Sequence, residues 1–328
     1  MRWMTHIALL AGAVLFTSLI VYQGAGDVAA AVAGAGWGLL WVAMYRLVPL
    51  CAEAVAWQRL LKADHRLPLR TVVWARWVGQ SINNLLPVMR VGGELVRARL
   101  LVRKGVAGAA AGASVVVDLT ATVLTQIVFG MIGVGLLVLQ LGASQAAMTL
   151  MVGIGLFGVL LAGFFVVQSR GLFGALARLL ERMAGGRNWL ALVGSADALD
   201  AAIVELYQDR RRVASASTWC MIGWLLGTGE AWLALRFLGH PVSLLDALMI
   251  ESLGQAVRAV GFAVPGALGV QEGGFLLLAS LLGMNPGTIL ALSLIKRVRE
   301  LTLGIPGLAA WQWDEGRLLR RRFAESVP

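Results

Sequence analysis

The stretch GQAVRAVGFAVPGALGVQEGG, residues 254–274, interrupts a hydrophobic part of the chain with a proline, several glycines and two charged side chains. Of the 328 residues, 59% are hydrophobic and only 14% are charged. Such a chain has too little polar surface to fold as a soluble globule, and apolar segments long enough to cross a hydrocarbon core of about 30 Å recur along it. The sequence therefore predicts one integral membrane domain, residues 1–328, in which the interruption needs an explanation.

The distribution of basic residues predicts the topology. The apolar spans are residues 3–22, 37–57, 106–139, 148–168, 213–237 and 286–313. The net charge of +10 comes mainly from alternate connections, with ten basic residues in 59–104, seven in 170–212 and four in the tail 314–328. Basic residues mark the cytoplasmic side, so both termini are expected there and no nucleic-acid partner is indicated. The first span also resembles a signal peptide, but an uncleaved span keeps this topology.

A second stretch, GQSINNLLPVMRVGGE at residues 79–94, repeats the features of the first. Both begin with Gly-Gln, and in both a proline is followed seven residues later by a glutamate: Pro87 by Glu94, and Pro265 by Glu272. Short coincidences of this kind are common, so the spacing alone is a weak signal.

The surroundings of the two stretches strengthen the repeat. In each half an ionisable residue stands 31 positions after the proline, Asp118 in the first and Lys296 in the second. Each half, about 1–140 and about 148–313, then contains two spans, a broken segment and a third span. Three crossings invert one half relative to the other, and paired broken segments of this kind indicate a transport site.

The physical cost of a proline predicts how the broken segments lie. Proline frees backbone carbonyls, which survive at membrane depth only when they are buried in protein or line water. We therefore expect residues 79–101 and 245–282 to form re-entrant hairpins that enter from opposite faces. The fold class is an all-α polytopic membrane protein with about six transmembrane helices and two such hairpins; the alternative is seven to eight full spans, two of them within 245–282.

Charged side chains within the predicted membrane region are costly unless they are paired or hydrated. Those in the spans are Arg46, Glu53, Asp118, Glu230, Lys296, Arg297, Arg299 and Glu300, and those in the broken segments are Arg90, Glu94, Arg97, Arg99, Glu251, Arg258 and Glu272. They are interpreted either as ion pairs that lock the bundle or as a transport site. Helical spacing would pair Glu94 with Arg97. Glu272 has no basic residue within four positions, which makes it the first functional candidate.

The connection 170–212 is predicted to form two amphipathic cytoplasmic helices. Its second helix contains Asp197 and Asp200, a pair that could hold magnesium against a lipid diphosphate in an enzyme, although a solvated helix face is the simpler interpretation. Cys51 and Cys220 lie in apolar segments and are interpreted as small hydrophobic residues. The sequence predicts no catalytic residue, metal site or cofactor.

The segments LLPVMRVGGELVRARLL and VPGALGVQEGGFLLL resemble the lysylphosphatidylglycerol synthase transmembrane family, the flippase part of the multiple peptide resistance factors and its stand-alone relatives. Within it, RLVPLCAEAVAWQRLL and GQAVRAVGFAVPGALGVQEGG are similar to stand-alone proteins associated with bacterial hopanoid biosynthesis. The resemblance implies a lipid flippase of the bacterial inner membrane, with membrane lipids and lipid- or hopanoid-biosynthesis proteins as partners. A lipid-modifying enzyme and a non-catalytic scaffold are the alternatives.

The resemblance and the ionisable residues together define the expected site. The expected substrate-binding residues are Gln80, Glu94, Arg97, Asp118, Gln255, Arg258, Glu272, Lys296 and Arg299, and the expected hinge or tip residues are Pro87, Gly92, Gly93, Pro265, Gly266 and Gly269. The chain departs from the full resistance factors because no aminoacyl-transfer domain follows its last span, so no aminoacyl-lipid synthesis is expected. It also has Phe275 where the first stretch has Arg97, so another basic residue would be needed in the second half.

Overall fold

The computed structural model describes residues 34, 36–61, 67–86, 92–141, 155, 196–260 and 286–325, and within these ranges all regular secondary structure is helical. The helices are α3 (Gly38–Tyr45), α4 (Leu47–Leu60), α5 (Leu69–Leu85), α6 (Gly92–Val102), α7 (Gly108–Leu141), α11 (Ala196–Gln208), α12 (Arg210–Phe237), α13 (Leu244–Val260) and α15 (Pro286–Glu325). An all-α fold is therefore confirmed for this part of the chain.

Several predicted features fall outside the described residues. These are the spans 3–22 and 148–168, the amphipathic segment 170–186, and the residues Pro87, Arg90, Pro265, Gly266, Gly269 and Glu272. Arg258 belongs to α13, in a part of the helix for which only the backbone is described.

Helix α5 begins at Leu69, before the start of the broken segment expected at residue 79. Its buried apolar residues, Val72, Ala75, Val78 and Ile82, recur at helical spacing, which explains why the helix starts earlier. Helix α15 continues into the predicted basic tail, and its extension is held to α6 and the turn after it by ion pairs of Glu315 with Arg99 and Asp314 with Arg103.

The first described span is broken at Arg46, between α3 and α4. Pro49 stands in the first turn of α4, where its missing N–H cannot bond to the carbonyl of Tyr45. Arg46 keeps helical dihedral angles, φ −57° and ψ −23°, so the chain continues in the same direction. The break places a charged side chain inside an apolar stretch that runs from Gly38 to Leu60.

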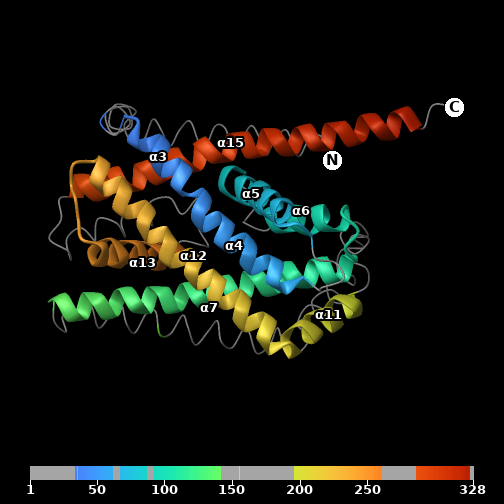
Figure 1. Cartoon of the computed structure of the whole chain (residues 1–328), viewed down its shortest axis with the longest axis horizontal. Helices are drawn as coiled ribbons and strands as arrows, with labels where there is room; N and C mark the ends of the chain where they lie inside the picture. Colours follow the sequence, from blue (N-terminus) through green and yellow to red (C-terminus); the bar gives the residue numbers. More distant parts are fainter. Residues whose placement is uncertain are drawn as a thin grey trace.

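Helices α4 and α12 lie side by side and run diagonally through the middle of the molecule, between the long helices α15 and α7 (Figure 1). Helix α12 packs along α4, α13 packs along α7, and α15 packs along α5. Helices α5 and α6 form an antiparallel pair beside α4 and α7. Helix α7 therefore contacts α13, and helix α15 contacts α5, so helices far apart in the sequence lie together.

Small residues allow these helices to approach closely. A Cβ on Gly133 of α7 would overlap Ser252 of α13, and a Cβ on Gly307 of α15 would overlap Ser81 of α5. Glycines in helix contacts are typical of membrane bundles, where close packing replaces the hydrophobic effect as the driving force. The α7–α13 and α15–α5 contacts thus use the same kind of packing.

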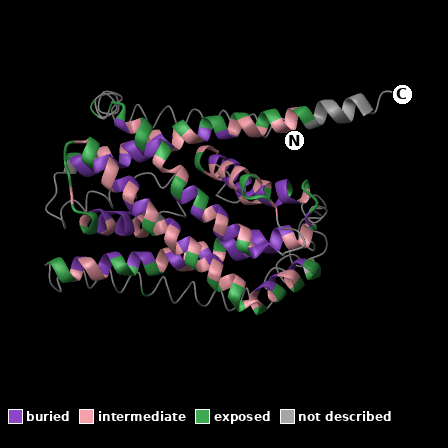
Figure 2. Cartoon of the chain, viewed as in Figure 1, coloured by how far each residue is buried: buried purple, intermediate pink, exposed green. Residues whose placement is uncertain are grey.

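The exterior of the bundle is apolar. Large exposed side chains include Trp37 just before α3, Trp41 and Met44 on α3, and Val128 and Met131 on α7. In Figure 2, exposed residues recur along the outer helices α7 and α15, whereas buried residues recur along the inner helix α4. Among the described residues, two helical stretches, Gly38–Leu60 and Gly108–Gln140, are long and apolar enough to cross a membrane.

Candidate functional site

The close contact between α5 and α6 brings polar side chains into the bundle. A Cβ on Gly93 would overlap the carbonyl oxygen of Gly79, and one on Gly79 would lie 2.5 Å from Cγ of Arg97. The N–H of Gly93, which has no partner within its own helix, donates to Oδ1 of Asn83 at 2.8 Å. The two glycines thus leave room for Arg97 to extend inward beside α5.

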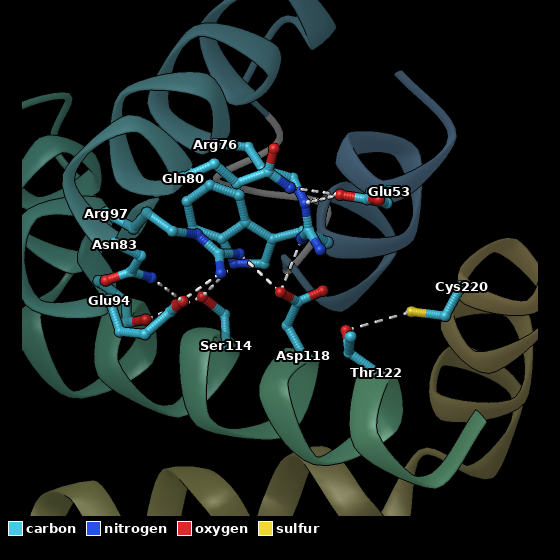
Figure 3. A network of polar contacts seen from close by, with 12 residues as sticks. Glu53, Arg76, Gln80, Asn83, Glu94, Arg97, Ser114, Asp118, Thr122 and Cys220 are labelled. Atoms are coloured by element: carbon cyan, nitrogen blue, oxygen red, sulfur yellow. Dashed lines mark hydrogen bonds and ion pairs between the residues drawn. The ribbon is translucent and has the colours of Figure 1, made fainter. Parts of the chain in front are cut away.

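Asp118 of α7 is the centre of the first charge cluster (Figure 3). Its Oδ2 accepts from Nη1 of Arg76 at 2.7 Å and from Nη2 of Arg97 at 2.6 Å, and all three side chains are buried. One carboxylate between two guanidinium groups leaves a local excess of positive charge, which further carboxylates must balance.

Two glutamates balance that charge from either side. Glu94 accepts from Nη1 of Arg97 at 2.6 Å and from Asn83 at 3.2 Å. Glu53 of α4 accepts from Nε of Arg76 at 3.1 Å.

Glu53 has two further partners. It accepts from Nε2 of Gln80 at 2.6 Å and from Nη2 of Arg46 at 3.0 Å. These residues form a chain of alternating charges, which we name the first cluster. Its members are Arg46, Glu53, Arg76, Asp118, Arg97 and Glu94, with Gln80 and Asn83 as neutral partners.

Trp57 and Ser114 form one wall of the first cluster. The guanidinium carbon of Arg97 lies 4.0 Å from the centre of the Trp57 ring, and the indole N–H donates to Ser114 at 3.2 Å. A cation over the face of a tryptophan is stabilised by the ring, so this contact fixes the side chain of Arg97.

Two buried polar atoms of the first cluster have no hydrogen-bond partner among the described residues. They are Nε of Arg97, a donor, and Oδ1 of Asp118, an acceptor. Buried polar atoms are nearly always satisfied in native proteins, so an unsatisfied donor and acceptor in one cluster indicate a place for water or a polar ligand.

The second cluster lies on α12, α13 and α15. Lys296 forms an ion pair with Glu251, which also accepts from Nε2 of Gln255 at 2.8 Å. Arg299 pairs with Glu230 at 3.3 Å and with Glu300 at 3.2 Å. These six residues are named the second cluster. Arg46 of the first cluster also interacts electrostatically with Glu230 and Glu251, so the two clusters influence each other.

The structure distributes the expected site residues between the two clusters. Glu94, Arg97, Asp118 and Gln80 belong to the first, with Gly92 and Gly93 at the start of α6, and Lys296, Arg299 and Gln255 belong to the second. The ion pair of Glu94 with Arg97 has the predicted helical spacing. The second acidic candidate, Glu272, lies outside the described residues.

Sequence reasoning missed Arg76 and Asn83. Arg76 was counted among the cytoplasmic basic residues, yet it stands four residues before Gln80 on the same face of α5, and that spacing was the available signal. Glu53, Glu230 and Glu251 were recognised as charges in the membrane region but were not assigned to the site, because their partners lie on other helices.

Three further features of the described structure lie outside the two clusters. An open groove of about 410 Å³ is lined mainly by apolar atoms of Gly36, Trp37, Leu39, Leu40, Val298 and Thr302. Asp197 and Asp200 lie in α11, which packs on α7 through Leu199 and Ile203. Among the residues that the structure describes, no group of three or more His, Cys, Asp and Glu side chains is arranged to hold a metal ion.

Comparison with known proteins gives one match. The family model for the lysylphosphatidylglycerol synthase TM region covers residues 4–307, nearly the whole chain. No curated protein and no solved structure matches at a significant level.

Proposed function

The chain belongs to the lysylphosphatidylglycerol synthase TM region family, and from that premise we propose that it moves lipids with polar head groups between the leaflets of a membrane. The observation that carries the proposal is the first cluster, a chain of six buried or half-buried charges inside a bundle with an apolar exterior. Charges within a membrane protein face the bundle interior and mark substrate pathways. A polar interior lowers the cost of carrying a head group through hydrocarbon while its tails stay in the bilayer.

The unsatisfied atoms support a ligand at the first cluster. The free donor on Arg97 and the free acceptor on Asp118 offer a head group one hydrogen bond of each kind without breaking an ion pair. A phosphate oxygen would accept from Arg97, and a hydroxyl or amine would donate to Asp118.

The packing of the helices supports an inverted repeat. Helix α5 of the first half packs on α15 of the second. Its equivalent in the second half, α13, packs on α7 of the first, as a pseudo-twofold axis requires. Trp77 of α5 donates to the carbonyl of Leu303 in α15 at 2.9 Å, and Gln126 of α7 donates to the carbonyl of Gln255 in α13 at 3.1 Å. Rocking of one half against the other would then open the site to each side in turn.

The lengths of the helices support a re-entrant segment in the first half. Helix α6 has 11 residues and spans about 17 Å, whereas a crossing needs about 30 Å. Its partner α5 runs antiparallel and is also short, with 17 residues. A hairpin that returns to the side it came from accommodates both lengths.

The finer assignments follow from the sequence and form part of the proposal. The membrane is the bacterial inner membrane, both termini are cytoplasmic, and the substrate is an anionic phospholipid or a hopanoid-type lipid. The expected partners are lipid- or hopanoid-biosynthesis proteins. Transport requires no covalent step, so we propose no enzymatic activity.

The test is leaflet exchange in liposomes of phosphatidylcholine that contain the purified chain and head-group-labelled lipids of several classes. Dithionite added outside destroys the outer label, and the remaining signal decays only if inner lipids reach the outer leaflet. We expect exchange by the native chain and at least a tenfold loss in Glu94→Gln, which removes a carboxylate from the first cluster.

Glu315→Gln is the matched control, because it also neutralises a glutamate paired with an arginine but lies outside both clusters. It should exchange lipid at the native rate. Native chain that exchanges no lipid of any class, while monodisperse before reconstitution, would contradict the proposal. Equal loss of exchange in both variants would show that transport does not depend on the first cluster in particular.

A further inference from the structure

The two clusters contain ion pairs at matching places, with the charges exchanged. In the first half, Arg76 stands four residues before the glutamine of the Gly-Gln pair, and its partner Asp118 stands 31 residues after the proline. In the second half, Glu251 stands four residues before the corresponding glutamine, and its partner Lys296 stands 31 residues after the proline. The helix that contains the Gly-Gln pair thus carries the cation in one half and the anion in the other.

The exchange also changes the chemistry of the pair. Arg76 is a fork that bridges Glu53 and Asp118, and Asp118 is held by a second fork, that of Arg97. A guanidinium keeps its proton in proteins, so this pair stays charged. Lys296 presents a single ammonium on a flexible stem, and its partner Glu251 is a carboxylate that can accept a proton. Of the two matching pairs, the one in the second half is suited to a proton step.

Gln255 is compatible with either protonation state of Glu251. Its Nε2 now donates to Oε1 of Glu251 at 2.8 Å, as a carboxylate requires. After rotation of the amide, its carbonyl oxygen can accept from a protonated carboxyl group. Gln255 is also connected to α7, because its backbone carbonyl accepts from Gln126.

The charged groups around the pair come from several helices. Helix α12 contributes Glu230, the break between α3 and α4 contributes Arg46, and α15 itself contributes Arg299 and Glu300. Glu230 and Arg299 pair with each other, and Arg46 pairs with Glu53. From α7, the neutral amide of Gln126 reaches Gln255. Both arginines among these neighbours are thus already held by glutamates, and Arg299 is shared by two of them.

We propose that the Glu251–Lys296 pair is a proton-coupling site, in which Glu251 takes up one proton when Lys296 leaves it to bind an anionic phosphate of the lipid head group. The step forms an O–H bond on Glu251 and breaks one in a hydronium ion, which comes from the aqueous phase that the site faces at that stage of the transport cycle. The Lys296 ammonium keeps its protons and exchanges one anion for another. The inference rests on the proposed function, since it needs the lipid to reach the second cluster.

The cost of a buried charge makes the two events dependent on each other. A carboxylate that loses a cation partner inside the bundle is destabilised, whereas the neutral acid is tolerated. A lipid with one negative charge therefore carries one proton, and the loaded site has the same net charge as the empty one. Glu94 does not fill this role, because Arg97 and Asn83 both hold it in the first cluster.

The experiment uses liposomes of phosphatidylcholine with a small fraction of acyl-labelled phosphatidylglycerol and the native chain. A gradient of one pH unit is imposed, and the share of label in each leaflet is read with dithionite. At one proton per lipid, phosphatidylglycerol should accumulate up to about tenfold in the leaflet that faces the higher pH. A potassium diffusion potential at equal pH should leave the distribution unchanged, since the carried charge is zero.

Glu251→Gln imitates the protonated state and should exchange lipid but distribute it equally under the gradient. Glu315→Gln, which neutralises a glutamate paired with an arginine outside both clusters, should keep the gradient response. If Glu251→Gln is not monodisperse, Lys296→Arg replaces it, and its exchange should need a lower pH because a guanidinium holds the carboxylate more firmly. Native chain that exchanges phosphatidylglycerol without responding to the gradient overturns the inference alone. Native chain that exchanges no lipid overturns the proposed function and the inference together.

Discussion

Asp118 shows how a single carboxylate organises the first cluster. Both of its guanidinium partners come from the helix pair α5 and α6, so α7 holds that pair through one side chain. The side chain is almost fully buried, and water cannot replace it as the counter-charge of Arg76 and Arg97. Its contribution to stability should therefore be much larger than that of a surface ion pair.

Asp118→Asn should destabilise the folded chain by about 3–5 kcal/mol, because the substitution leaves two buried guanidinium groups with one carboxylate fewer. The measurement is unfolding in detergent micelles, followed by intrinsic tryptophan fluorescence. Glu315→Gln, at an ion pair that is partly open to solvent, should cost less than about 1 kcal/mol. Equal stability of Asp118→Asn and the native chain would mean that the first cluster does not hold α7 to α5 and α6.

At the scale of one element, the position of α6 depends on the contact of its first turn with α5. Gly93 lies so close to Gly79 that an added methyl group overlaps a backbone oxygen, which cannot move as a side chain can. Gly93→Ala should therefore separate the two helices and withdraw Arg97 from Asp118. We expect lipid exchange to fall at least tenfold, with the helical content by circular dichroism unchanged.

Gly105→Ala would not serve as a control, because its φ of +90° disfavours any side chain. Gly135→Ala on α7 is suitable, since a Cβ there meets no atom within 4 Å. It should exchange lipid like the native chain. If Gly93→Ala also exchanges lipid at the native rate, the close contact of α6 with α5 is not needed for transport.

The N-terminus of α13 gives a prediction about pH. Ser243 and Asp246 form a reciprocal cap, in which the hydroxyl donates to the carboxylate at 2.7 Å and accepts from the N–H of Asp246 at 3.1 Å. Hydrogen bonds from Gln140 and from Ser243 lower the pKa of Asp246 below 3.8. The cap therefore contributes fully above the ordinary pKa and is lost as the pH falls through the lowered value.

The difference in melting temperature between the native chain and Asp246→Asn measures this contribution. It should be constant from pH 8 to pH 5 and shrink below about pH 4, and a difference that grows on acidification would contradict the sign. The cap matters for the bundle because Gln140, at the end of α7, reaches the same carboxylate at 3.0 Å.

At the scale of the whole molecule, the sequence predicts the helices better than their partners. Hydrophobic spans and the Glu94–Arg97 spacing are local patterns. The ion pair is present in the structure, and helices cover the expected spans that lie within the described residues. The partners of Asp118 depend on which helices meet, which no local pattern contains. Arg76 illustrates the difficulty, because counting basic residues assigns it to the cytoplasmic side, whereas its buried guanidinium lies between Glu53 and Asp118.

The exchanged contacts of the two halves lead to a prediction for the complete bundle. If α5–α15 and α13–α7 are equivalent contacts of an inverted repeat, each must change when the halves rock, and fixing either one should stop transport.

The contacts offer matched pairs for disulfides, since a Cβ on Gly307 would lie 2.9 Å from that of Ser81, and one on Gly133 would lie 2.9 Å from that of Ser252. These separations are short enough for a disulfide after a small adjustment of the helices. In a chain with Cys51 and Cys220 replaced by alanine, oxidation of Ser81→Cys/Gly307→Cys and of Ser252→Cys/Gly133→Cys should reduce lipid exchange by similar factors, and dithiothreitol should restore it. Inhibition by one bridge but not the other would mean that the two halves do not move as equivalent units.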